Sequence, residues 1–134
     1  MGHTFNTNIH PHFYMTKHTL LHFPHGSAII NNTSINAYVG RLDLLDYTST
    51  EGAIISFHNV GRGIRVNAVA PSPVWAPLIP ATTTDKALKS FTAPMGRPAQ
   101  PSEIATCFVL LASTDISAIP GQTLHPNSGV VVNE

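Results

Sequence analysis

The sequence predicts an α/β fold, on the basis of two strand-like runs and the helical segment between them. Residues 28–30 are short and apolar, and polar residues follow them, as at the end of a buried strand. Residues 64–70 form a second run of this kind, preceded by two closely spaced glycines. Between the runs, residues 47–57 carry apolar side chains at helical spacing. Strands and helices that alternate along one chain define the α/β class.

We expect seven elements along the chain. In order, they are a helix at 5–22, a strand at 28–33, a helix at 47–57, a strand at 64–69, a weak helix at 82–91, a helix at 101–113 and a strand at 121–125. Pro11 interrupts the first helix because it removes a helical N–H group. The glycines at 61 and 63 are expected to stop the helix at 47–57.

The remaining elements follow from proline placement. Pro101 in the first turn and an early Glu103 favour the start of the helix at 101–113. Four prolines between residues 71 and 80 predict a loop there. Pro120 stands at the entrance of the last strand, so that strand is the least well specified of the three.

Length and composition indicate one small domain over residues 1–134. Only 10% of the residues are charged, and seven Lys and Arg residues balance seven Asp and Glu residues, so nothing attracts the chain to nucleic acid or to an anionic membrane. No stretch approaches the roughly 18 apolar residues of a membrane span, and the N-terminus lacks the apolar core of a signal peptide. We therefore expect a cytoplasmic location, with Cys107 as a structural thiol in the core.

Two hydroxyl groups are the candidate chemistry. Ser34 follows the strand at 28–33, and Tyr47 opens the next helix. The carboxyl edge of the strands is where open α/β sheets place their functional groups. We expect both side chains to meet at that edge.

This pair and several other motifs resemble the C-terminal half of the short-chain dehydrogenase/reductase family. The further motifs are PSPVWAPL at 71–78, PMGRP at 94–98 and GQTLHPN at 121–127. The match covers nearly the whole chain and is closest to the glucose/ribitol dehydrogenase branch. It implies a Rossmann-like, doubly wound parallel sheet, of which this single incomplete domain holds about three strands with flanking helices. The cofactor-binding first half of such a domain is missing from the sequence.

The resemblance also assigns roles to residues. It implies NAD(P) as cofactor and a small-molecule alcohol or carbonyl compound as substrate. The serine orients the substrate oxygen, the tyrosine exchanges a proton with it, and an asparagine completes the proton relay; these residues are Ser34, Tyr47 and Asn8. The loop under the nicotinamide, together with the tyrosine, gives the cofactor-binding residues Tyr47, Pro71, Ser72, Val74 and Ala76.

Several positions depart from the family pattern. The catalytic lysine four residues after the tyrosine is Glu51, whose carboxylate opposes ionisation of a phenol with an ordinary pKa of ~10. A glycine and a threonine of the nicotinamide loop are Ser72 and Ala76, and the first glycine of a later pair is Ser128. No G-x-x-x-G-x-G spacing for a pyrophosphate occurs in the sequence. We therefore expect the isolated chain to be an inactive, truncated pseudoenzyme that binds no NAD(P).

Two alternatives remain open. The first is a non-catalytic fragment stabilised by docking on a partner chain, either a paralogue or a second copy of this one. The second is a histidine-dependent metal binder, because six of the eight histidines lie in the first 25 residues and His18 and His22 are one helical turn apart. No carboxylate or cysteine joins them at ligand spacing, so the metal site is the weaker alternative.

Overall fold

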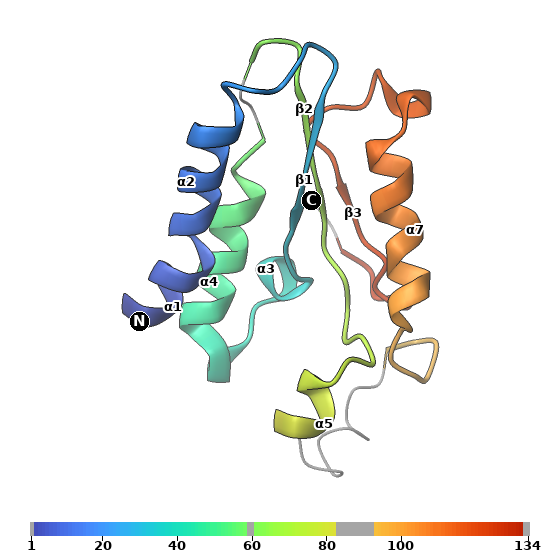
Figure 1. Ribbon diagram of the computed structural model, residues 1–134. Coiled ribbons are helices and arrows are strands. Elements are labelled where there is room, and N and C mark those ends of the chain that lie inside the picture. The colour runs from blue at the N-terminus through green and yellow to red at the C-terminus, as the bar shows by residue number, and fades with distance from the viewer. Residues whose placement is uncertain (1, 59–60, 83–92, 133–134) are drawn as a thin grey trace.

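A computed structural model describes residues 2–58, 61–82 and 93–132 of the protein. Its centre is a parallel sheet with the strand order β1-β2-β3 (Figure 1). The strands are β1 (Ala28–Asn32), β2 (Arg65–Val69) and β3 (Thr123–Leu124). Helices α1, α2 and α4 lie on one side of this sheet and α7 on the other (Figure 1). The predicted α/β class and the Rossmann-like arrangement of three parallel strands are confirmed.

The helices differ from the prediction mainly at their ends. Their bounds are α1 Gly2–Asn8, α2 His10–Thr19, α3 Asn36–Val39, α4 Leu45–Ile55, α5 Leu78–Thr82 and α7 Pro101–Ala112, with 3-10 turns η1 Leu42–Leu44 and η2 Thr114–Ile116. The single helix predicted at 5–22 is wrong, because the chain breaks at Ile9 and α2 starts with Pro11 in its first turn. Proline fits there because first-turn N–H groups have no helical partner.

Helix α4 also ends earlier than predicted. It stops at Ile55 and not at the glycines, because the side-chain amide of Asn31 donates to the Phe57 carbonyl oxygen (3.0 Å) and ties the chain to the end of β1. The glycines serve the turn before β2 instead, with positive φ angles at Gly61 and Gly63.

The C-terminal half departs from the prediction in two places, and one predicted helix there is not tested. The proline-rich segment expected as a loop contains the short helix α5. Most of the helix expected at 82–91 lies outside the described residues. Strand β3 is shorter than expected because Asn67 holds the chain just before it, donating to the Ile119 carbonyl oxygen and accepting from the Gln122 amide (both 2.9 Å).

The core lies between the sheet and α7. It consists of Val69, Ala99, Ile104, Leu111 and Ile116, with Cys107 packed against it as expected for a structural thiol. Four of the five residues of β2 are buried, as is usual for a central parallel strand covered on both faces. In register, Asn32 of β1 lies opposite Val69, so both strands end at the same edge.

The turn before β2 provides a test of local backbone strain. Gly61 and Gly63 have φ angles of 65° and 66°, but only at Gly63 would an added Cβ meet another group, the Nε2 atom of His25 at 2.2 Å. We expect Gly61→Ala to cost about 1 kcal/mol from the left-handed backbone and Gly63→Ala about 2 kcal/mol because the ring must also move. Urea unfolding measures the free energy of unfolding of both variants, each prepared with and without His25→Ala. If His25→Ala does not reduce the additional loss of stability caused by Gly63→Ala, the contact with the His25 ring is not the cause of that loss.

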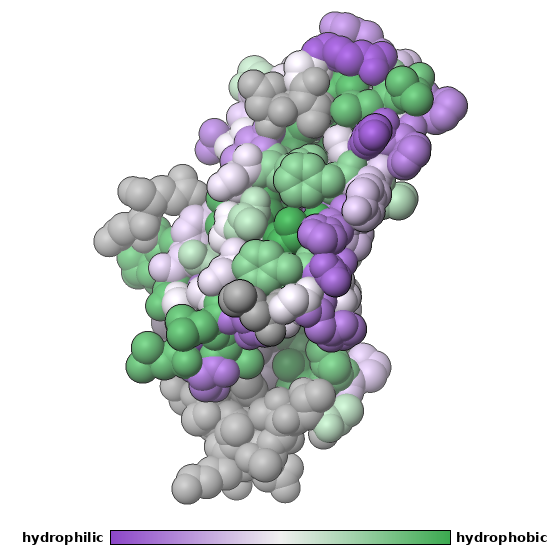
Figure 2. All heavy atoms as spheres, turned by 90° about the vertical axis from the view of Figure 1, so that its left-hand side faces the viewer, coloured by the Kyte–Doolittle hydropathy of each residue, from purple (hydrophilic) through white to green (hydrophobic). Residues whose placement is uncertain are grey.

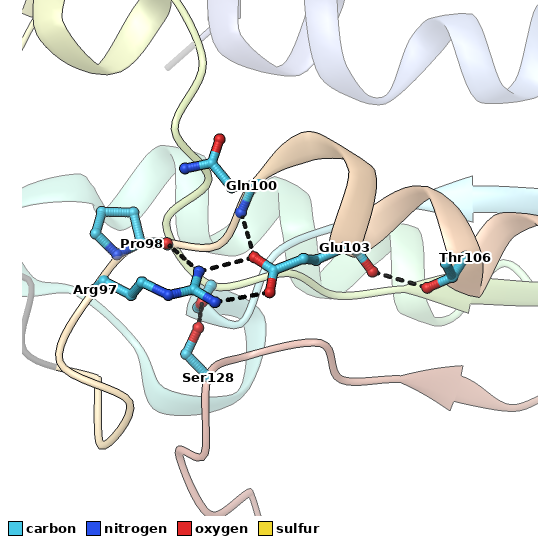
Figure 3. A network of polar contacts seen from close by, with 7 residues as sticks. Arg97, Pro98, Gln100, Glu103, Thr106 and Ser128 are labelled. Atoms are coloured by element: carbon cyan, nitrogen blue, oxygen red, sulfur yellow. Dashed lines mark hydrogen bonds and ion pairs between the residues drawn. The ribbon is translucent and has the colours of Figure 1, made fainter.

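The start of α7 is fixed by a polar network (Figure 3). The Glu103 carboxylate accepts from both terminal nitrogens of Arg97 (2.8 Å each) and from the Gln100 amide (2.7 Å). These donors lower the pKa of Glu103 to about 2. A carboxyl with a depressed folded-state pKa stabilises the protein above its unfolded value of 4.5 and loses that contribution as the pH falls to about 2.

This network predicts an acid-dependent loss of stability. Between pH 4.5 and about 2, the free energy of unfolding should fall more steeply in the wild-type chain than in Glu103→Gln. Denaturation at stepped pH values measures this difference. Asp115→Asn removes a different exposed carboxylate and serves as the control. Parallel curves for wild type and Glu103→Gln would contradict the assignment.

Candidate active site

The candidate site lies at the carboxyl ends of β1 and β2. Past the last residue of β1, the Thr33 amide donates to the Val69 carbonyl oxygen (2.8 Å) and the Ile35 amide to that of Pro71 (3.0 Å). These bonds extend the pairing of the two strands and hold Ser34, which stands between the two donors, at the edge of the sheet. The sequence prediction placed Ser34 at this edge.

Helix α4 brings Tyr47 and Glu51 to the same place. Tyr47 stands in its first turn and is half-buried, and its phenol lies near enough to the side chains of Ser34 and Glu51 for both to influence its pKa. Glu51 is one helical turn further on and only 6% exposed. Thr33, also buried, donates its hydroxyl hydrogen to the Glu51 carbonyl oxygen (2.9 Å) and so fixes this turn of the helix to the strand end.

These surroundings keep the phenol protonated. Burial raises the pKa of Tyr47 most strongly, the negative charge of Glu51 raises it further, and only the nearby Ser34 hydroxyl lowers it. Burial also raises the pKa of Glu51, against the lowering effects of Thr33 and Tyr47. Sequence reasoning named the charge at position 51, but it missed burial, which is the larger cause.

Asn8 joins α4 by a different route. Its side-chain amide donates to the hydroxyl of Thr50 (3.0 Å), which in turn donates to the Tyr47 carbonyl oxygen (2.7 Å). Thr50 is completely buried. The structure therefore brings Ser34, Tyr47 and Glu51 close together and links Asn8, through Thr50, to the backbone of Tyr47. A relay role for Asn8 stays a prediction.

The loop after β2 divides into two parts. Pro71, Val74 and Ala76 line an open groove of about 380 Å³. The other lining residues are Asn32 and four residues of α7, namely Pro101, Ile104, Ala105 and Phe108. Ser72 is buried with its hydroxyl 3.3 Å from that of Ser128, so its side chain is held by the C-terminal segment.

Sequence reasoning missed two residues that support the site, Thr33 and Thr50, and it missed the contact between Ser72 and Ser128. Thr33 immediately precedes Ser34, and Thr50 stands three residues after Tyr47, so helical spacing was a usable signal for the second. Nothing in the spacing of Ser72 and Ser128 indicates that two positions so far apart in the chain meet.

The structure gives no support to the histidine alternative. Within the described ranges, no group of three or more histidine, cysteine, aspartate or glutamate side chains is placed to hold a metal ion. In the same ranges, no helix combines the length and the apolar character of a membrane span.

The parallel sheet with helices on both sides defines a Rossmann-like α/β domain, and proteins of known structure share this fold. The family profile described as Enoyl-(Acyl carrier protein) reductase matches residues 1–131. Glucose and ribitol dehydrogenase of Daucus carota is 53% identical over 137 residues, covering 96% of this chain and 47% of that protein. The chain belongs to the short-chain dehydrogenase/reductase family, and it spans about half the length of the curated relatives it matches.

Solved structures agree. A short-chain dehydrogenase/reductase of Brucella melitensis, described as a glucose/ribitol dehydrogenase, superposes with a TM-score of 0.84 at 28% identity, over 96% of this chain and 55% of that one. The angucycline C-6 ketoreductase LanV with bound NADP gives 0.79 at 26% identity, over 87% of this chain and 48% of that one.

Proposed function

We propose that the chain forms the substrate side of an NAD(P)-dependent oxidoreductase site for small alcohols or carbonyl compounds. One observation carries this proposal: Ser34 stands at the carboxyl edge of the sheet, and Tyr47, in the first turn of α4, lies near enough for the serine hydroxyl to influence the pKa of the phenol. Ser34 would orient the substrate oxygen, and Tyr47 stands where a proton must be exchanged with it. The oxidoreductase relatives support the same assignment.

We further propose that this chain by itself is a pseudoenzyme. An acid/base group works best when its pKa lies near the operating pH, whereas burial and Glu51 move the pKa of Tyr47 upward from 10.0. Glu51 occupies the position at which the family resemblance implies a lysine. The carboxylate therefore acts against the ionised phenol that proton transfer requires.

The residues present suit only part of the cofactor. Pro71, Val74 and Ala76 offer an apolar wall against which the flat nicotinamide ring, the part of NAD(P) that exchanges hydride, could rest. Glu51 supplies no cation for the adjoining ribose, and the sequence holds no glycine-rich spacing for the pyrophosphate. We therefore derive no hydride step for this chain alone.

The prediction for cofactor binding is that the chain shows no saturable NADH or NADPH binding with Kd below about 100 μM, an affinity of roughly −5.5 kcal/mol. Isothermal titration calorimetry measures it, with an intact family member of known affinity as the positive control. A heat signal that saturates below this limit would overturn the proposed loss of cofactor binding.

A second candidate function is docking on another chain, which keeps the fragment and pseudoenzyme alternative. In the described part of the chain, β1 pairs with β2 alone, and its residues 28–30 are only half-buried. Figure 2 shows apolar side chains on the face of α1, α2 and α4. Phe13 of α2 is 57% exposed, and its ring contacts the ring of Phe57 edge to face, with 5.2 Å between the ring centroids. An unpaired strand edge and an apolar face both favour association.

Sedimentation velocity of the purified chain distinguishes association with a second copy from association with a paralogous chain. A concentration-dependent dimer supports the homo-oligomer, and a stable monomer that a paralogous chain binds supports heterologous docking. A monomer that binds neither partner would count against this candidate.

We assign the cytoplasm as location from composition alone, and a fluorescent fusion tests it.

A further inference from the structure

Two serines that are far apart in the sequence meet beside the open groove. Ser72, in the loop after β2, is 6% exposed, and its hydroxyl oxygen lies 3.3 Å from that of Ser128, in the segment after β3. Either hydroxyl can donate to the other. The resemblance to the family implies glycine at both positions, so this hydroxyl pair distinguishes the chain from the family pattern.

The backbone joins the same two segments only weakly at this point. Pro71 and Pro73 flank Ser72, and neither carries an N–H group. The Ser72 amide donates to the Pro126 carbonyl oxygen, but at 3.4 Å this bond is long. The hydroxyl pair therefore adds a second link where the backbone provides one weak link.

The backbone of Ser128 is fixed in an unusual conformation. Its φ angle of 59° lies in the left-handed region, which residues other than glycine seldom adopt. The Met95 amide donates to the Ser128 carbonyl oxygen (3.1 Å), and the side chain of the buried neighbour Asn127 donates to the Val130 carbonyl oxygen (2.7 Å). Because these bonds hold the segment on both sides, the Ser128 hydroxyl is a fixed point for Ser72.

The link at Ser72 lies at one end of the groove wall. The groove-lining residues of the loop are Pro71, Val74 and Ala76. Further along, the Ala99 amide donates to the Pro73 carbonyl oxygen (3.0 Å), and the Trp75 amide donates to the Ala99 carbonyl oxygen (2.8 Å). The wall is therefore attached by side chains at its start and by backbone bonds at its middle.

We propose that Ser72 and Ser128 are positioning residues, whose hydroxyl contact holds the loop after β2 so that the groove keeps its shape without a ligand. A wall that is already in place spares a ligand the cost of ordering it. The inference rests on the proposed function in one respect, because this wall is the one assigned to the nicotinamide ring.

Native-state amide hydrogen exchange of the full chain tests the proposal without any ligand. The amides of Trp75 and Ala99 report on the wall, and the Ala68 amide, which donates to the Gln122 carbonyl oxygen (2.9 Å), reports on the sheet. Ser128→Ala leaves the buried Ser72 hydroxyl without this partner, so we expect exchange of the two wall amides to become about tenfold faster. Exchange of the Ala68 amide should change by less than about twofold.

Ser72→Ala gives a different expected size. It removes the buried hydroxyl itself and leaves Ser128, which is only half-buried and can bind water, so the wall amides should exchange about threefold faster. The double variant should be no faster than Ser72→Ala, because the unpaired buried hydroxyl is gone. Ser117→Ala changes an exposed serine at the end of η2 and is the matched control, with no expected change.

Three results would overturn the proposal. They are unchanged wall amides in both single variants, an Ala68 amide that accelerates as much as the wall amides, and a double variant whose effect is the product of the two single effects. The outcome is separable from that of the proposed function. If the exchange rates behave as expected but the groove binds no nicotinamide, the positioning role stands and the proposed occupant of the groove is wrong.

Discussion

Glu51→Lys should lower the pKa of Tyr47 and still give no measurable NAD(P)-dependent turnover of any sugar, polyol or ketone. The phenol ionises more easily because the neighbouring charge changes from an anion to a cation. Hydride exchange also requires a bound nicotinamide, and the substitution supplies no pyrophosphate site. Absorbance of the reduced nicotinamide measures turnover, and titration of the tyrosinate absorbance confirms that the substitution acted on the phenol.

A chimera separates the lysine from the rest of the architecture. An intact glycine-rich N-terminal half of a relative is fused to this chain. The chimera that carries Glu51→Lys should then have a kcat about 10²–10⁴-fold higher than the chimera that keeps Glu51, the usual effect of a general acid/base. Turnover by the unfused Glu51→Lys chain would show that the first half is dispensable. A chimera that binds cofactor but stays inactive with lysine would point to the break at Ile9 or the short helix α4.

Leu111→Ala should destabilise the domain by about 2–5 kcal/mol, as for a large side chain removed from a close-packed core. Leu111 is 1% exposed and packs between α7 and the sheet with Val69 and Ile104. Leu110 is the matched control, because it is the same residue type in the same turn but 45% exposed, and Leu110→Ala should cost about 1 kcal/mol or less.

Urea unfolding of the two variants measures the difference. The expected result is a lower midpoint for Leu111→Ala at an unchanged slope, with Leu110→Ala close to wild type. Equal effects would mean that α7 does not pack on the sheet through Leu111. A larger effect at Leu110 would indicate that another chain covers this face of α7.

The sequence predicted secondary structure and site positions correctly where the local pattern and the burial of the residues agree. Branched apolar runs identified β1 and β2, and Pro101 with Glu103 marked the start of α7 to the residue. The position of Ser34 and Tyr47 followed from the end of a strand and the first turn of a helix. These features depend on neighbours in sequence, so the sequence contains them.

Features set by distant contacts were not predictable. The end of α4 depends on an amide from Asn31, and the short β3 depends on Asn67, each far away along the chain. The position of Asn8 depends on Thr50 in another helix. Local sequence pattern alone favours a longer α4 and a longer β3, and hydrogen bonds to distant side chains end both elements earlier.

The ionisation of Tyr47 tests the central claim most directly. Protein with tyrosine labelled at the ring carbon that bears the hydroxyl is titrated by NMR, and Tyr47→Phe assigns the signal. We expect a Tyr47 pKa above the ordinary 10.0 in the wild-type chain, and a lower pKa in Glu51→Gln because the charge is removed. A wild-type pKa at or below 10.0, or one that Glu51→Gln leaves unchanged, would contradict it.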